Sequence, residues 1–280
     1  MRVIESCAEC LYDKQKHLSD DEEYLREVRQ IIADRAEQDT APYLVYLFGQ
    51  VSEMRFGKKA PFGEIKRKYN DMVLSMEDAI RARIESAPDP LAAALACARV
   101  GNYIDFGAMN SVEEEVFLAL FDDAELSARD REVYQSFLRQ CETAERFLLI
   151  ADNCGEIVLD RLFLQQLKKT FPQLEITVMV RGDEVLNDAT EEDARYVRLD
   201  QVARVISNGS AVAGTVYEML PEEAREVFDQ ADVVLAKGQG NYESICGRGR
   251  RVFYSFLCKC ELFTNRFQVP KLTGIFIEEG

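Results

Sequence analysis

The stretch FLLIADNCGEIVLDRLFL, residues 147–164, decides the fold. An apolar run leads into Asp152 and Asn153, and Gly155 and Glu156 follow before an amphipathic segment. This order predicts a buried strand, a tight turn and a helix that starts beside two oxygen-bearing side chains. Open α/β sheets bind ligands at the carboxyl ends of such strands. Asp152 and Asn153 are therefore the first candidate site residues, whereas capping and helix-end electrostatics explain Glu156.

Composition limits the class of protein. The chain has 280 residues, of which 47% are hydrophobic, enough for one large or two moderate domains with a substantial core. No apolar run approaches the roughly 20 residues of a membrane helix, and the start MRVIESCAEC lacks a signal-peptide region, so we expect a cytoplasmic protein. The net charge of −16 argues against binding to nucleic acid or, unaided, to anionic membranes. Oligomeric state has no readable signal.

Histidine and cysteine usage narrows the chemistry. With His17 as the only histidine, the sequence argues against a Ser-His-Asp triad, a multi-histidine zinc site and an HExxH motif. Eight scattered cysteines without an export signal fit reduced thiols. The CAEC motif at Cys7 and Cys10 could be half of a zinc site completed by Cys258 and Cys260, or a redox pair. Buried or incidental thiols are the favoured interpretation.

The two halves of the chain differ in their periodicity. Residues 1–145 have apolar residues at helical spacing and predict a helical domain, with one helix over 61–84 and an Ala-rich helix that ends at Gly101. Residues 146–280 alternate strands and helices, which predicts a mostly parallel sheet covered on both faces. We expect an α/β fold: a three-layer α/β/α Rossmann-like sheet domain with an N-terminal helical bundle.

A second pair of polar residues follows the second expected strand. Asn187 and Asp188 lie before a predicted helix, and alone they would be only a turn and a cap. Their likeness to Asp152 and Asn153 favours a site, because a parallel sheet brings such turns to one edge. Two carboxylates and an amide, without histidine, form an oxygen-donor site suited to Mg²⁺ or Mn²⁺.

Three further features are candidates for binding an anion or closing the site. In AKGQGNYES, residues 236–244, Gly238 and Gly240 would let backbone amides approach an anion, although a tight turn explains them as well. Lys259 follows an expected strand, where its cation could pair with a phosphate or be solvated. The loop GNYIDFG could close over the site or merely cap a helix. The polar residues in these segments are Asn102, Asp105, Lys237, Gln239, Asn241 and Tyr242.

Together these segments resemble the metal-dependent damage-control phosphatases, a family also known as domain of unknown function eighty-nine. The resemblance covers nearly the whole chain, and the N-terminal CxxC is similar to the mostly prokaryotic branch. The matching motifs, in order, are CAEC with Gln15, PFGEIKRKYN, RVGNYIDFG, ADNCGE, LNDATEED, KGQGNYE and FLCKC.

The resemblance implies an α/β/α fold with an N-terminal helical bundle and a divalent cation, Mn²⁺, Mg²⁺, Co²⁺ or Ni²⁺. Asp152, Asn153 and Asp188 would hold that cation, and Lys259 would bind the phosphate of the substrate. Further substrate contacts implied by the motifs are Asn102 and Asp105 from the helical side and Gly238, Gly240, Asn241 and Tyr242 from the sheet.

The sequence therefore predicts a metal-dependent phosphomonoesterase that acts on small phosphorylated metabolites, with Asp152, Asn153 and Lys259 as catalytic residues. Either an Asp attacks as a covalent nucleophile or water attacks directly. Water attack is favoured, because the strong carboxylate candidates are already assigned to the metal. The alternatives are a non-catalytic phosphometabolite or nucleotide binder and a cysteine-based zinc or redox protein.

Overall fold

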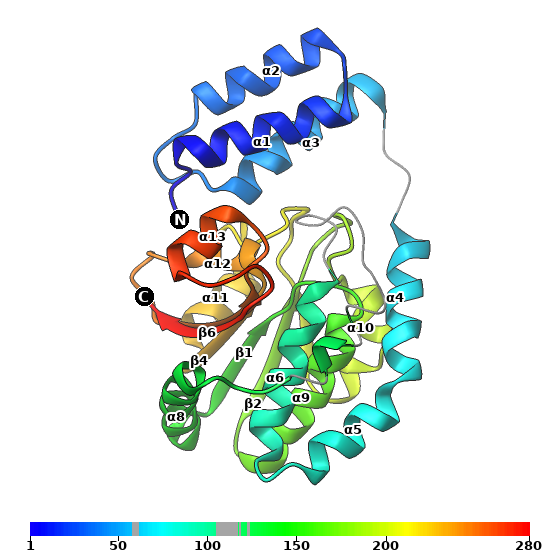
Figure 1. Ribbon diagram of the computed structural model, residues 1–280, viewed down its shortest axis with the longest axis vertical. Helices are drawn as coiled ribbons and strands as arrows, with labels where there is room; N and C mark the ends of the chain where they lie inside the picture. Colours follow the sequence, from blue (N-terminus) through cyan, green and yellow to red (C-terminus); the bar gives the residue numbers. More distant parts are fainter. Residues whose placement is uncertain (58–61, 105–116, 118, 122–123) are drawn as a thin grey trace.

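A six-stranded sheet with the strand order β3-β2-β1-β4-β5-β6 forms the centre of the molecule (Figure 1). The computed structural model describes residues 1–57, 62–104, 117, 119–121 and 124–280. All strand pairs are parallel except β5 with β6. The order reverses between β1 and β4, which is where doubly wound sheets bind ligands. The strands are β1 (Arg146–Ile150), β2 (Glu175–Val180), β3 (Arg204–Ser207), β4 (Val233–Lys237), β5 (Val252–Leu257) and β6 (Gly274–Glu279).

Helices cover both faces of the sheet because alternate strand residues point to opposite sides. On β1, Phe147 and Leu149 join one core cluster, whereas Leu148 and Ile150 join the other. The first face is covered by α6 (Pro90–Val100), α8 (Ala128–Thr143) and α9 (Glu156–Thr170). The opposite face is covered by α11 (Glu222–Gln230), α12 (Gln239–Ile245) and α13 (Glu261–Phe267). The predicted three-layer α/β/α class is confirmed.

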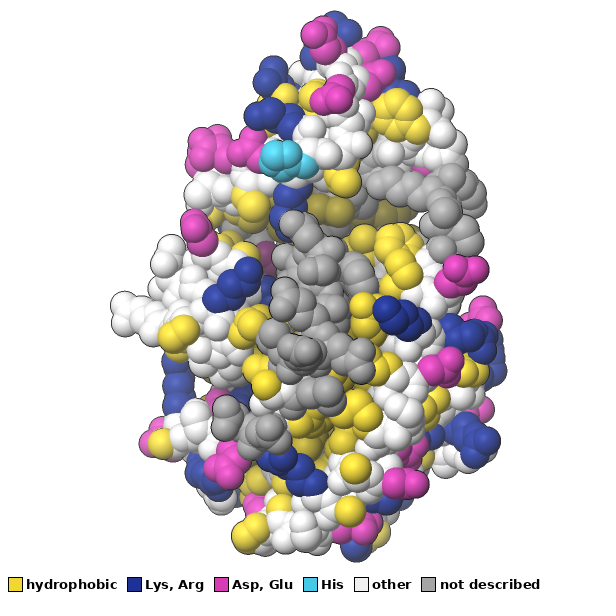
Figure 2. Space-filling view, turned by 45° about the vertical axis from the view of Figure 1, so that its right-hand side comes forward, with side chains coloured by type: hydrophobic (Ala, Val, Ile, Leu, Met, Phe, Trp, Pro, Cys, Tyr) yellow, Lys and Arg dark blue, Asp and Glu magenta, His cyan; other side chains and the backbone are white. Residues whose placement is uncertain are grey.

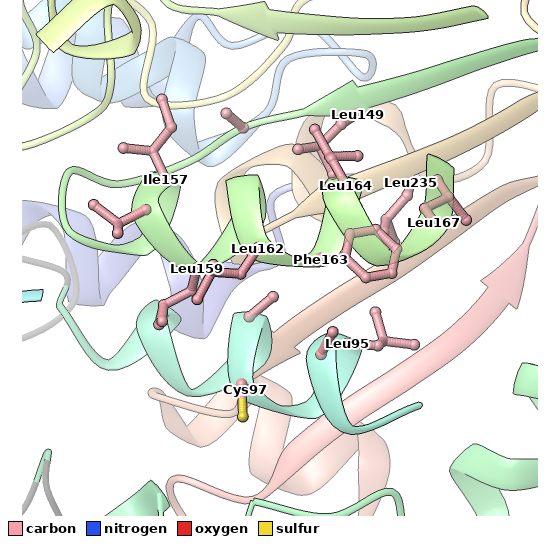
Figure 3. Close-up of a cluster of buried hydrophobic side chains, with 14 of the residues drawn as sticks. Leu95, Cys97, Leu149, Ile157, Leu159, Leu162, Phe163, Leu164, Leu167 and Leu235 are labelled. Atoms are coloured by element: carbon pink, nitrogen blue, oxygen red, sulfur yellow. The ribbon is translucent and has the colours of Figure 1, made fainter. Parts of the chain in front are cut away.

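The helix α6 packs closely on α9, and this contact fixes the position of the chain that follows α6 (Figure 3). The alanines of α6 allow this approach, and Leu95 and Leu159 lie in the contact layer. A Cβ atom on Gly101, just after α6, would lie 2.7 Å from the Cα atom of Glu156. The chain after α6 is therefore held directly against the first turn of α9.

The first three helices form a bundle with its own core: α1 (Glu5–Leu18), α2 (Glu22–Ala33) and α3 (Ala41–Phe56). This bundle packs on the sheet domain through α3 and α12. By contrast, α4 (Gly63–Ser75), α5 (Glu77–Ser86), α6 and α8 share one core with the sheet. The division into residues 1–145 and 146–280 stays a prediction; β1 begins at Arg146.

Two secondary-structure predictions are wrong in detail. The single helix expected over 61–84 is two helices that meet at Met76, because Glu77 and Asp78 favour a helix start and Glu77 accepts hydrogen bonds from Arg81 and Arg161. The segment 236–244, expected as a glycine-containing loop or tight turn, instead contains most of the helix α12, Gln239–Ile245. No helix within the described residues is long and apolar enough to cross a membrane. Acidic and basic side chains are interspersed on the described part of the face in Figure 2.

Candidate active site at the carboxyl edge of the sheet

The two polar turns predicted from the sequence meet at one edge of the sheet. Asn153, after β1, and Asp188, after β2, form an isolated β-bridge. The Ala189 N–H donates to the backbone oxygen of Asp152 at 2.8 Å, and the Cys154 N–H donates to that of Asn187 at the same distance. Asp152 and Asp188 are both buried. Two segments more than thirty residues apart are thus fixed side by side by their own backbones.

A guanidinium group lies between the two carboxylates. Arg181, directly after β2, is 1% exposed. Its Nε donates to Oδ2 of Asp188 at 2.6 Å, and its Nη2 donates to Oδ1 of Asp152 at 3.2 Å. The sequence interpretation missed this residue, although an arginine that ends the apolar run EITVMV was a visible signal.

The other oxygen of Asp152 is held by two side-chain amides. Asn153 Nδ2 donates to Oδ2 of Asp152 at 2.7 Å, and Asn102 Nδ2 donates to the same oxygen at 3.0 Å. Both nitrogens also donate to Oε2 of Glu156, each at 3.1 Å. Because the nitrogen of Asn153 is committed to two acids, its carbonyl oxygen is the atom that remains for a cation. Asn102, which follows α6, is therefore in direct contact with Asp152, and its predicted contact with substrate stays a prediction.

Glu156 does more than the capping inferred from the sequence. Its Oε2 accepts a hydrogen bond at 3.4 Å from the N–H of Asn153, in the turn before the helix, and its Oε1 binds Nζ of Lys237 at 2.7 Å. Lys237 also binds Oδ1 of Asp160 at 2.6 Å, and all three side chains are fully buried. Burial raises the pKa of Asp160 to about 7, against the lowering effect of Lys237. Lys237 is thus a buried structural cation rather than a group that faces an anion.

The glycines after β4 are required by close contacts. Gly238 has φ +81°, and a Cβ atom there would lie 2.0 Å from Oδ2 of Asp152. Its N–H donates to the Ser255 carbonyl at 3.1 Å, so this amide already has a partner. A Cβ atom on Gly240 would lie 2.1 Å from the Ala213 carbonyl oxygen. Both glycines allow protein segments to approach each other, and the prediction that their amides hold an anion is untested.

Of the remaining predicted residues, Asn241 and Lys259 lie at the carboxyl edge of the sheet, whereas Tyr242 lies in the core. Asn241 joins the site, because its Oδ1 accepts a hydrogen bond from Nη1 of Arg181 at 3.1 Å. Lys259 is buried after β5, so the solvated-surface interpretation is wrong, and its N–H donates to Gln239. Tyr242 instead packs among Tyr254, Phe256, Phe263 and Phe267, and its hydroxyl donates to Glu279 at 2.6 Å. Asp105 lies outside the described residues.

The buried donor set fits a small, hard cation. Asp152 and Asp188 supply carboxylate oxygens and Asn153 supplies a carbonyl oxygen, the ligand types that Mg²⁺ and Mn²⁺ prefer. Within the described residues, no three or more His, Cys, Asp and Glu side chains cluster in a way that could hold a metal, so the amide is needed to complete the set.

The cysteines give no support to the zinc or redox alternative. Each cysteine is a free thiol, and in the described part of the chain no cysteines join a group of three or more side chains that could hold a metal ion. Burial raises the pKa of Cys7 to about 12, which disfavours the thiolate needed for metal binding or disulfide exchange. We therefore give Cys7 and Cys10 no part in the site.

We predict that Gly238→Ala displaces Asp152 and abolishes cation binding, because the new methyl group would overlap the carboxylate. Gly247→Ala is a matched control, since Gly247 has a similar φ of +87° and nothing within 4 Å of its Cβ position. We expect the control to lose about 1–2 kcal/mol of unfolding free energy from backbone strain alone. Urea denaturation and Mn²⁺ titration of both variants measure the difference. Equal effects in the two variants would contradict the contact with Asp152.

Comparison with known proteins points to one family. A family model described as the damage-control phosphatase ARMT1-like domain matches residues 2–273. A damage-control phosphatase from Archaeoglobus fulgidus is 29% identical over 278 residues, which cover 93% of this chain and 93% of the relative. Another, from Pyrococcus horikoshii, is 30% identical over 219 residues, or 77% of this chain and 73% of the relative. The crystal structure of a DUF89 family protein from Pyrococcus horikoshii aligns over 100% of both chains, with a TM-score of 0.80 and 25% identity.

Proposed function

The chain belongs to the damage-control phosphatase family of ARMT1-like domains and is a phosphatase, and from this premise we propose that it uses a divalent cation held by Asp152, Asn153 and Asp188 to hydrolyse small phosphorylated metabolites. The family resemblance of the sequence is thereby confirmed; the branch suggested by the CxxC motif stays a prediction. The observation that carries the proposal is the meeting of two buried carboxylates from separate turns at the carboxyl edge, where the strand order reverses.

The residues of this chain hold the ligand atoms in a fixed arrangement. Asn102 and Asn153 each donate to Asp152, so this carboxylate cannot rotate without losing two hydrogen bonds. Glu156 holds both amides in the same orientation, which keeps the carbonyl oxygen of Asn153 available. A bound cation supplies the electrostatic part of the chemistry, by polarising a phosphoryl oxygen and lowering the pKa of water.

Lys259 is our proposed contact for the phosphate. It follows β5, which pairs with β4, and so belongs to the same edge of the sheet as the carboxylates. The chain carries it in a buried position, anchored by the hydrogen bond of its N–H to Oε1 of Gln239 at 2.8 Å. A buried lysine near a cation site suits a dianionic phosphate, because the two positive groups together offset its charge.

We predict that activity depends on added metal. The test is phosphate release from a panel of hexose phosphates by chelator-treated protein, with Mg²⁺, Mn²⁺, Co²⁺ or Ni²⁺ restored one at a time. We expect no measurable turnover after chelation and recovery with at least one of these ions, because Lys259 alone then offsets the phosphoryl charge and no cation activates water. Turnover that survives EDTA would remove the metal from the mechanism. Substrate-dependent shifts in melting temperature without phosphate release would favour a binding protein.

A further inference from the structure

The guanidinium of Arg181 bonds directly to both carboxylates that we propose as cation ligands. Its three nitrogens reach four side chains: Nε binds Asp188, Nη2 binds Asp152, and Nη1 binds Asn241 and, at 3.5 Å, Thr215. The partners come from the turns after β1 and β2, from α12 and from the segment that precedes α11. This one guanidinium therefore connects the segments that form the site, and it lies at the centre of them.

The hydrogen bonds leave Arg181 little freedom to move away. Thr215 donates from its hydroxyl to Oδ1 of Asn241 at 2.9 Å, and Asn241 Nδ2 donates to the carbonyl oxygens of Ala151 and Lys237 at 3.1 and 2.7 Å. Asn241 is thus fixed from both ends of its amide. A cation that binds to Asp152 and Asp188 would share them with Arg181 rather than displace it.

We propose that Arg181 is a positioning residue that weakens cation binding while it keeps the two carboxylates in the orientation that turnover requires. This inference rests on the proposed function. One oxygen of each carboxylate is engaged by the guanidinium, which disfavours two-oxygen chelation by either Asp. The fixed positive charge also repels a divalent cation nearby. Removing the charge should therefore tighten cation binding. It should also free the carboxylates of Asp152 and Asp188 to leave the orientation that turnover requires.

Removal of Arg181 is expected to raise cation affinity but to lower turnover. These opposite changes distinguish a positioning role from a purely structural one. If Arg181 only held the carboxylates in place, its removal would weaken cation binding and turnover together. Arg161 offers a matched control, because it is another buried arginine whose guanidinium bonds to Glu77 and to the Val197 carbonyl oxygen instead of to Asp152 and Asp188. Its variants report the cost of losing a buried ion pair elsewhere.

The experiment measures Mn²⁺ affinity and steady-state hydrolysis of p-nitrophenyl phosphate for the wild type, Arg181→Gln, Arg181→Lys and Arg161→Gln. Mn²⁺ affinity is read from the electron paramagnetic resonance signal of the free ion, so it does not depend on activity. We expect Arg181→Gln to bind Mn²⁺ about tenfold tighter and to lose about a hundredfold in kcat. Arg161→Gln should lower the melting temperature and leave the Mn²⁺ affinity unchanged.

Arg181→Lys keeps the charge but loses the planar fork, because one ammonium group cannot reach all four partners. We expect its Mn²⁺ affinity to stay within about threefold of wild type while kcat falls. This variant decides the case if Arg181→Gln does not fold. Weaker or unchanged Mn²⁺ binding in folded Arg181→Gln, or unchanged kcat in Arg181→Lys, would overturn the inference alone. A wild type that binds no Mn²⁺ and hydrolyses nothing would overturn the proposed function as well.

Discussion

Asp152→Asn should remove cation binding and lower kcat by about a thousandfold or more, the largest effect that we expect from any single site residue. The substitution keeps the size of the side chain but replaces a charged ligand by a neutral amide. It also sets an NH₂ group against nitrogen donors, because Asp152 accepts hydrogen bonds from Asn102, Asn153 and Arg181. Isothermal titration with Mn²⁺ and a phosphate-release assay measure the two losses separately.

The control is Asp200→Asn, which changes an exposed acid and the net charge by the same amount. We expect it to leave both Mn²⁺ affinity and kcat within about twofold of wild type, because exposed charges are screened. If Asp152→Asn folds, binds Mn²⁺ and turns over normally, the cation lies elsewhere. Loss of turnover with undiminished Mn²⁺ affinity would instead assign Asp152 a role in the chemical step.

Local sequence patterns are sufficient to predict the sheet and the juxtaposition of the first two proposed ligands. Apolar runs followed by Asx residues and a helix start mark the ends of β1 and β2, and parallel pairing then brings Asp152 and Asp188 together. Asn102 could be predicted only as a residue near the cleft. Its bond to Asp152 depends on how closely α6 packs against α9, where Gly101 removes the side chain that would hold the helices apart.

The buried charges could not be predicted, because their partners are distant in the sequence. Lys237 binds Glu156 and Asp160, which lie 81 and 77 residues earlier, and nothing in KGQGN distinguishes such a lysine from one that faces a ligand. The aromatic packing of Tyr242 could not be predicted for the same reason. A tyrosine beside a glycine-rich turn suggests a binding loop, but residues 239–245 form a helix whose buried side carries Tyr242 into the aromatic core.

Lys237→Met should destabilise the fold by about 3–5 kcal/mol at pH 8, because it leaves Glu156 and Asp160 buried together without their cation. The loss should be smaller at pH 5.5. In the wild type the pKa of Asp160 is already raised to about 7. Protonation of Asp160 therefore adds to the free energy of unfolding at low pH, and this addition is lost as the pH rises toward 7. Without the lysine the folded pKa rises further, and protonation relieves the repulsion at pH 5.5 but not at pH 8.

Urea unfolding of the wild type and variant at both pH values, in EDTA, measures this dependence without any contribution from bound metal. The double variant Lys237→Met/Asp160→Leu is the control, because it removes the second carboxylate together with the lysine and replaces the pair by apolar side chains. We expect it to recover more than half of the lost stability at pH 8 and to show less change with pH than the single variant. If the single variant loses the same unfolding free energy at pH 5.5 and at pH 8, then repulsion between the buried carboxylates of Glu156 and Asp160 is not the cause of the loss. Since Glu156 also orients Asn102 and Asn153, a stable double variant with normal Mn²⁺ affinity would further show that Glu156 holds these amides without help from Lys237.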